Sequence, residues 1–228
     1  MGKMVTFPSN GGTCEGYLAL PESGSGPGVI VVQEWWGLVG HITAVADRFA
    51  AAGYVALCPD LFRGKQTTEP DEAQKLLMGL KIDQVTKDLN GAAGYLVGRA
   101  EVSSTGVGVV GFCMGGGLAL LAGSVSDHVV AAVGFYPATP WPDYAPDWAR
   151  YAGKSAQVHK AESDSWADPM IAGLAAEITA AGGTIEVFDY PGSHHAFFND
   201  DRPEVYSAAD SAVAWDRTMS LFEGALAG

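Results

Sequence analysis

Two kinds of hydrophobic pattern alternate along the chain. Short continuous runs of apolar, β-branched residues are typical of strands buried on both faces, whereas apolar residues that recur every three or four positions are typical of amphipathic helices. We predict strands at residues 4–7, 13–20, 29–32, 54–57, 107–110, 129–135, 157–159 and 184–190. We predict helices at residues 42–49, 71–80, 83–97, 118–125, 169–181 and 205–226.

The alternation of strands and helices indicates βαβ units. Such units build a mostly parallel, doubly wound sheet that is covered by helices on both faces. The chain has 228 residues and shows neither a linker nor an internal repeat, so we expect a single α/β domain over residues 1–228. Residues 137–154 form a long connection rich in proline and aromatic residues, and long connections in compact domains are often functional.

Composition and charge narrow the possible functions. Hydrophobic residues make up 48% of the chain and charged residues 17%, which excludes a disordered protein. The net charge of −13 repels phosphate backbones and anionic lipids, so we expect neither nucleic acid nor a membrane as a partner. Three cysteines are too few and too sparse for a disulfide framework. Because we also find no apolar leader and no apolar stretch of about 18 residues, we expect a cytoplasmic location.

The strongest chemical signal is Gly111-Phe112-Cys113-Met114-Gly115-Gly116, directly after the predicted strand 107–110. A strand, a tight turn with small residues and a helix form a nucleophile elbow, here with cysteine in the usual place of serine. The helix N-terminus lowers the pKa of such a thiol and offers an N–H group to an oxyanion. The alternatives are a buried structural cysteine and a phosphate-binding loop, but no Gly-Lys-Ser/Thr follows.

A thiol nucleophile needs a base, and histidine is the usual one. His194 and His195 lie between the last predicted strand and the last helix, and the chain order of nucleophile, acid and histidine fits an α/β-hydrolase. The spacing to the following aromatic residue favours His195, and His194 is then an exposed loop residue. The other three histidines are expected to be surface or structural residues. No pair of histidines has the spacing of metal ligands, so we expect no metal and no cofactor.

The acid that orients this histidine should follow the strand at 157–159. Glu162, Asp164 and Asp168 are the candidates. Asp168 precedes a proline and is better explained as a helix N-cap. Asp164 falls in the loop past the carboxyl end of the strand, where open α/β sheets carry catalytic groups, and Glu162 is its main competitor.

Four segments together resemble a known family, the dienelactone hydrolases (carboxymethylenebutenolidases). They are Gln33-Glu34-Trp35-Trp36-Gly37, Cys58-Pro59-Asp60-Leu61-Phe62, the elbow at 111–116 and Pro-Gly-Ser-His-His-Ala-Phe at 191–197. The resemblance covers almost the whole chain in the same order. It implies an α/β-hydrolase fold and a small-molecule lactone or activated ester as substrate. It also implies a triad of Cys113, His195 and Asp164.

The same resemblance implies roles for residues around the triad. Glu34 would contact the resting thiol and shift when substrate binds, although a carboxylate here could instead cap the next helix. The N–H groups of Trp35 and Met114 would form the oxyanion hole. Trp35 and Trp36 are large side chains for a surface loop, so we expect them to line the substrate site together with Phe197, with packing of the tryptophans against the proline-rich loop as the alternative.

One feature departs from the family. The best-known members hold the substrate carboxylate with arginines, one of them four residues after the catalytic histidine, where this chain has Asn199. Arg63 and Arg202 are the nearby arginines that could take over the role, since lysine is a poorer bidentate clamp. We therefore expect a hydrolase of lactones or activated esters that favours neutral substrates. The alternatives are a thioesterase or acyltransferase of the same fold and a catalytically silent binding or regulatory protein.

Overall fold

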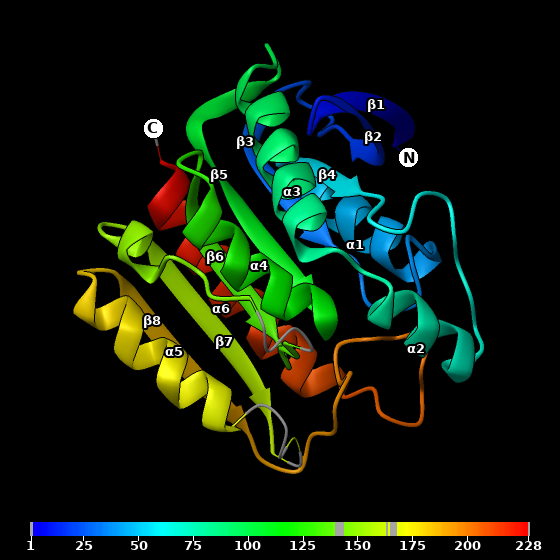
Figure 1. Cartoon of the computed structure of the whole chain (residues 1–228), viewed down its shortest axis with the longest axis vertical. Helices are drawn as coiled ribbons and strands as arrows, with labels where there is room; N and C mark the ends of the chain where they lie inside the picture. The colour runs from blue at the N-terminus through cyan, green and yellow to red at the C-terminus, as the bar shows by residue number, and fades with distance from the viewer. Residues whose placement is uncertain (1, 140–143, 163, 165–167, 228) are drawn as a thin grey trace.

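The computed structural model describes residues 2–139, 144–162, 164 and 168–227 (Figure 1). Its strands form one sheet in the order β1-β2-β4-β3-β5-β6-β7-β8. The strands are β1 (Lys3–Ser9), β2 (Gly12–Ala19), β3 (Gly26–Val32), β4 (Val55–Pro59), β5 (Val102–Phe112), β6 (Val129–Phe135), β7 (Ser155–Ala161) and β8 (Thr184–Tyr190). The helices are α1 (Gly40–Ala51), α2 (Pro70–Met78), α3 (Ile82–Val97), α4 (Met114–Val125), η1 (Trp148–Tyr151), α5 (Asp168–Ala180) and α6 (Ala208–Leu226).

The sheet is mostly parallel, as the sequence predicts. The β1–β2 and β2–β4 pairs are antiparallel, and every other pair is parallel. A tight turn joins β1 and β2, and within it Asn10 and Gly11 have φ angles of 51° and 73°. Asparagine and glycine tolerate this left-handed conformation, which joins two strands tightly.

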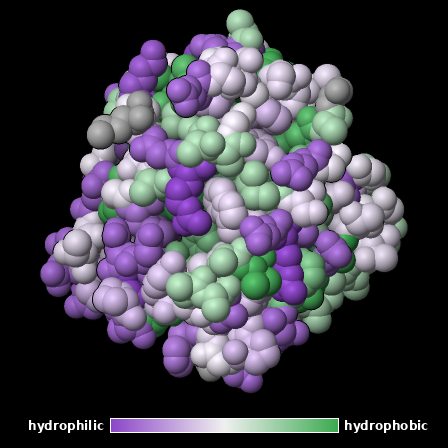
Figure 2. Space-filling model, turned by 180° about the vertical axis from the view of Figure 1, so that it is seen from behind, coloured by the Kyte–Doolittle hydropathy of each residue, from purple (hydrophilic) through white to green (hydrophobic). Residues whose placement is uncertain are grey.

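Helices cover both faces of the sheet (Figure 1). α3, α4 and α5 lie in front of the sheet in this view, and α1 and α6 lie behind it. Because both faces are covered, strands β3 to β6 are almost entirely buried, which explains their continuous apolar runs. Seen from behind, the surface shows hydrophilic residues interspersed with small apolar areas (Figure 2). In the part of the chain that the structure describes, no helix is long and apolar enough to cross a membrane.

Some boundaries differ from the prediction. β5 starts at Val102, five residues before the expected strand, because its first half contains polar residues that interrupt the apolar run. α6 starts at Ala208 rather than at Val205, because the hydroxyl of Ser207 caps the helix by accepting from the backbone N–H of Asp210 at 3.4 Å. The long connection at 137–154 contains η1, and residues 140–143 within it lie outside the described residues.

The parallel strands end at one edge of the sheet, where α/β proteins place their functional sites. The segment between β8 and α6, orange in Figure 1, runs along this edge toward α2. There it approaches the segment that follows β4, since residues of both segments line one pocket.

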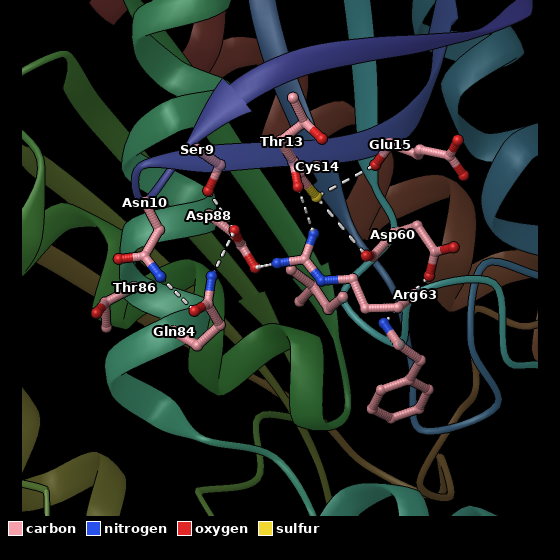
Figure 3. Close-up of polar contacts among 12 residues, drawn as sticks. Ser9, Asn10, Thr13, Cys14, Glu15, Asp60, Arg63, Gln84, Thr86 and Asp88 are labelled. Atoms are coloured by element: carbon pink, nitrogen blue, oxygen red, sulfur yellow. Dashed lines mark hydrogen bonds and ion pairs between the residues drawn. The ribbon is translucent and has the colours of Figure 1, made fainter.

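A polar cluster anchors the β1–β2 hairpin and the segment after β4 to α3 (Figure 3). Asp88, which is 1% exposed, is its centre. Its carboxylate accepts from Nη2 of Arg63 at 2.5 Å, from Nε2 of Gln84 at 3.1 Å and from the hydroxyl of Ser9. Arg63 also donates to the carbonyl oxygen of Thr13 at 3.3 Å. One buried carboxylate therefore holds three segments together.

We expect Asp88→Ala to lower the free energy of unfolding by about 2 kcal/mol, because it leaves the buried hydroxyl of Ser9 and the partly buried Arg63 and Gln84 side chains without their shared acceptor. Asp127→Ala is the control, since Asp127 forms an exposed ion pair with Arg150, and such pairs contribute little to stability. Urea unfolding of both variants measures the difference. Equal midpoints for the two variants would show that this cluster does not stabilise the fold.

Candidate active site

Cys113 lies between the end of β5 and the start of α4. Its φ and ψ angles are 56° and −121°, a strained conformation for a residue with a side chain. Neighbouring glycines permit the tight turn: a Cβ atom on Gly111 would lie 1.9 Å from the carbonyl oxygen of Gly115, and one on Gly115 would lie 2.3 Å from that of Gln33. The glycines of the motif thus let α4 pack closely against β5 and β3 with the thiol at its N-terminus.

The imidazole of His195 lies between a carboxylate and this thiol. Its Nδ1 is 2.6 Å from Oδ2 of Asp164, which is 7% exposed, and its ring also interacts with Cys113. Burial lowers the pKa of His195, but the hydrogen bond to Asp164 and the interactions with Cys113 outweigh burial and raise this pKa to about 10. The arrangement therefore favours the protonated imidazole of His195 beside the carboxylate of Asp164.

The competing residues lie elsewhere. His194 is exposed. The carboxylate of Glu162, also exposed, accepts from the backbone N–H of Gly192 at 2.6 Å. Asp168 is the first residue of α5, and the residues that directly precede it lie outside the described residues.

Glu34 follows β3 and is 2% exposed. Its Oε2 accepts from Nδ2 of Asn199 at 2.8 Å. Burial raises the pKa of this carboxyl, whereas His41, Asn199, His195 and Arg202 lower it. The side chain does not cap the next helix, because α1 begins at Gly40 without a side-chain cap. Glu34 is therefore a buried carboxylate in the same site as His195.

Tyr136 is a site residue that the sequence analysis misses. It directly follows β6, is fully buried and has a φ of 37°. Its ring centroid lies 4.9 Å from that of His195. Burial raises the pKa of its hydroxyl, and the charges of Glu34 and Cys113 raise it further. Its place at the carboxyl end of a buried parallel strand is the signal that could have indicated it.

The two tryptophans lie beside this site. Their ring centroids are 4.9 Å apart in an edge-to-face arrangement. Trp36, Asn199 and Arg202 line a pocket of about 340 Å³ together with Val39, His41, Thr67, Thr68 and Asp201. Met114 is the first residue of α4, where a backbone N–H has no acceptor within the helix.

The structure corrects two expectations about substrate-binding residues. Arg63 is held by Asp88 in the cluster of Figure 3 and does not line this pocket. Phe197 is fully buried in the core, with its ring centroid 5.5 Å from that of Tyr136 and 4.8 Å from that of Tyr190. The position of Phe197 two residues after His195 therefore reflects its packing in the core beneath the site. Arg202 does line the pocket, but its Nε and Nη2 are each 2.9 Å from Oε1 of Glu204.

The remaining histidines have different surroundings. His128 is exposed. His159 is buried between the hydroxyls of Tyr190 and Thr218, at 2.8 and 3.2 Å, and burial lowers its pKa to about 3. His41, by contrast, is 3% exposed and lines the pocket, with Nδ1 3.0 Å from Oδ1 of Asp200. Among the described residues, no three histidine, cysteine or acidic side chains are grouped as metal ligands.

The mostly parallel sheet, the elbow after β5 and the helices on both faces define an α/β-hydrolase. The sequence model of the dienelactone hydrolase family matches residues 14–226, and the chain belongs to this family. Membership of this family identifies the protein as a carboxylic-ester or lactone hydrolase.

Individual relatives are similar to this chain over almost their whole length. "Protein usf" of Aquifex pyrophilus is 34% identical over 98% of both chains. Two others bear names qualified as putative. One is a carboxymethylenebutenolidase of Aquifex aeolicus, 29% identical over 98% of both chains. The other is a dienelactone hydrolase of Klebsiella pneumoniae, which is 25% identical. Its crystal structure superposes on this structure with a TM-score of 0.84, and the match covers 97% of this chain and 98% of the Klebsiella chain.

Proposed function

We propose that the chain hydrolyses lactones and activated esters with Cys113 as nucleophile, His195 as acid and base, and Asp164 as the residue that orients the imidazole. The observation that carries the proposal is the position of the Cys113 thiol. Its backbone is strained at the N-terminus of α4, and the thiol contacts His195, whose Nδ1 is 2.6 Å from the buried carboxylate of Asp164. Nucleophile, base and orienting acid in this order are the requirement for acyl transfer through a covalent intermediate.

The reaction proceeds through a thioester. His195 takes the thiol proton of Cys113, and the thiolate adds to the carbonyl carbon of the substrate. The carbonyl π pair moves onto oxygen, where the N–H groups of Trp35 and Met114 stabilise the negative charge. As the C–O bond of the ester or lactone breaks, the His195 imidazolium protonates the leaving oxygen.

Water completes the cycle. His195, now neutral, takes a proton from water, and the resulting hydroxide adds to the thioester carbonyl. The C–S bond breaks, the product acid leaves, and the proton on His195 returns to the Cys113 thiolate. The contacts with Asp164 and Cys113 that raise the pKa of His195 suit these steps, because they stabilise the imidazolium, which must form twice.

Alkylation tests the proposal directly. We expect one equivalent of iodoacetamide to modify Cys113 and to abolish turnover of a nitrophenyl ester in proportion to the fraction modified. Peptide mass spectrometry identifies the labelled cysteine, and a competing ester should protect it. Cys14 and Cys58 are buried and serve as internal controls, because burial raises the pKa of both thiols. Full alkylation of Cys113 with undiminished turnover would refute the proposal.

We expect neutral substrates to react with a higher kcat/KM than anionic ones. Asn199 is committed to Glu34, and the Arg202 guanidinium is shared with Glu204. The missing charge-assisted hydrogen bond costs about 1.5–3 kcal/mol, or roughly a tenfold to hundredfold loss in specificity for an anion. The measurement is kcat/KM for an anionic dienelactone and for a neutral short-chain ester at two salt concentrations. A preference for the anion that Arg202→Ala removes would contradict this expectation.

A further inference from the structure

His195 lies in the segment between β8 and α6, and its hydrogen bond to Asp164 fixes only one atom of the ring. Nδ1 is 2.6 Å from Oδ2 of Asp164, and the His195 side chain is partly exposed. A hydrogen bond at one ring nitrogen leaves the imidazole free to turn about the axis of that bond. Proton transfer to and from the thiol of Cys113 needs a defined orientation of the whole ring. A second contact is therefore needed to set the plane of the imidazole.

The ring of Tyr136 provides such a contact. Its centroid lies 4.9 Å from the centroid of the His195 imidazole, and the two planes are inclined by 56°. The same ring packs edge-to-face against the buried Phe197, with 5.5 Å between the centroids. Tyr136 directly follows β6, so the support for a histidine in a loop comes from the end of a buried strand.

Tyr136 is itself held in one position relative to the nucleophile. Its backbone N–H donates to the carbonyl oxygen of His159 at 2.7 Å. Its neighbours bind both backbone groups of Cys113, because the carbonyl oxygen of Phe135 accepts from the N–H of Cys113 and the N–H of Ala138 donates to its carbonyl oxygen, each at 3.0 Å. The φ of 37° at Tyr136 is a conformation that a residue with a side chain keeps only where its surroundings hold it. Its backbone is thus tied to the nucleophile elbow.

The hydroxyl of Tyr136 does not account for this residue. Its Oη is buried and has no hydrogen-bonding partner among the described residues. The charge of Glu34 raises the pKa of the hydroxyl, but no hydrogen bond of ordinary length and angle joins the two side chains. A buried hydroxyl without a partner destabilises the folded protein. The ring is therefore the part of Tyr136 that has a defined contact in the site.

We propose that Tyr136 is a positioning residue whose ring holds the imidazole of His195 in the plane that faces Cys113. Asp164 fixes Nδ1, and Tyr136 fixes the orientation of the ring about that atom. Tyr136 acts through His195 and takes no part in bond formation or proton transfer. The inference rests on the role proposed for His195 where activity is the readout, but the orientation of the imidazole can also be measured without turnover.

Replacing the ring by a flexible chain tests the inference. Methionine fills irregular space in a core but has no plane against which an imidazole can rest. We expect Tyr136→Met to lower kcat about tenfold to a hundredfold while KM changes by no more than about twofold, because a slightly misplaced base loses this much rate. Tyr136→Phe keeps the ring and should retain kcat within about threefold of the wild type.

Phe222→Met is the matched control. Phe222, like Tyr136, is fully buried in the same apolar core, but its ring packs against Phe49 and Tyr54. The same substitution at this position should lower the urea midpoint and leave kcat within about threefold of the wild type. Where Tyr136→Met does not fold, Tyr136→Leu and Phe222→Leu replace the pair.

Proton NMR gives a readout that needs no substrate. The proton between Nδ1 of His195 and Asp164 gives a downfield resonance, which is identified by its absence in His195→Ala. We expect the same sharp resonance in the wild type, Tyr136→Phe and Phe222→Met. In Tyr136→Met it should shift or broaden, because a tilted imidazole exchanges this proton with water more rapidly.

The outcomes separate this inference from the proposed function. An unchanged resonance in Tyr136→Met overturns the inference, and so does an unchanged kcat of this variant in an enzyme that needs His195. Equal losses of kcat in Tyr136→Phe and Tyr136→Met also overturn it, since they assign the effect to the hydroxyl, and an equal loss in Phe222→Met overturns it in favour of core packing. A changed resonance in Tyr136→Met with full turnover by His195→Ala supports the positioning of the imidazole and contradicts the proposed function.

Discussion

Replacing Cys113 with alanine is expected to lower kcat/KM for a nitrophenyl ester and for a lactone at least about a thousandfold. Alanine offers no atom that can form the bond to the acyl carbon. It keeps the Cβ atom of cysteine, so the strained backbone at φ 56° tolerates it no worse than the native residue. Steady-state kinetics measure the loss, and circular dichroism with urea unfolding shows whether the fold persists.

Cys58→Ala is the matched control for this variant. Cys58, unlike the partly exposed Cys113, is buried in the core near the end of β4, where its Sγ donates to the carbonyl oxygen of Ile42 at 3.6 Å. We expect activity close to that of the wild type, because among the described residues no histidine is hydrogen-bonded to this thiol. Turnover by Cys113→Ala at the wild-type rate, with an unchanged circular dichroism spectrum, would remove Cys113 from the mechanism.

The layered architecture could be predicted because burial leaves a direct trace in the sequence. β3 and β6 are covered on both faces and therefore consist of apolar runs. The order of strands could not be predicted in this way. β4 lies between β2 and β3, although it follows both in the chain, and a hydrophobic pattern records that a strand is buried but not which strand lies beside it.

In the candidate site, too, some residues could be predicted from the local sequence and others could not. Cys113 could be identified from its own neighbours in the chain, since the elbow needs glycines on both sides. The positions of Asn199 and His41 depend on partners 165 and 159 residues away, and no local pattern marks such pairs. The sequence offers Arg63 as a substrate-binding residue, because an arginine near the site is a plausible ligand for an anion. Its actual partner, Asp88, lies on a helix whose packing the sequence does not reveal.

His195→Ala is expected to lower kcat/KM about a thousandfold, whereas His194→Ala should change it by no more than about twofold. The two residues are adjacent, but only His195 reaches Asp164, with 2.6 Å between Nδ1 and Oδ2, and only its ring interacts with Cys113. His194 is exposed to solvent. Because both variants remove the same side chain from the same loop, their comparison separates loss of the base from general disturbance of the loop.

The acid can be assigned by the same comparison. Asp164→Asn should lower kcat without abolishing turnover, because the carboxylate orients the imidazole and stabilises its charge but takes no proton itself. It should also move the basic limb of the pH profile to lower pH, since the hydrogen bond that His195 donates to Asp164 is the strongest of the interactions that raise the pKa of His195 to about 10. Glu162→Gln is the control, because that carboxylate binds the backbone of Gly192. A silent Asp164→Asn together with an impaired Glu162→Gln would transfer the orienting role to Glu162.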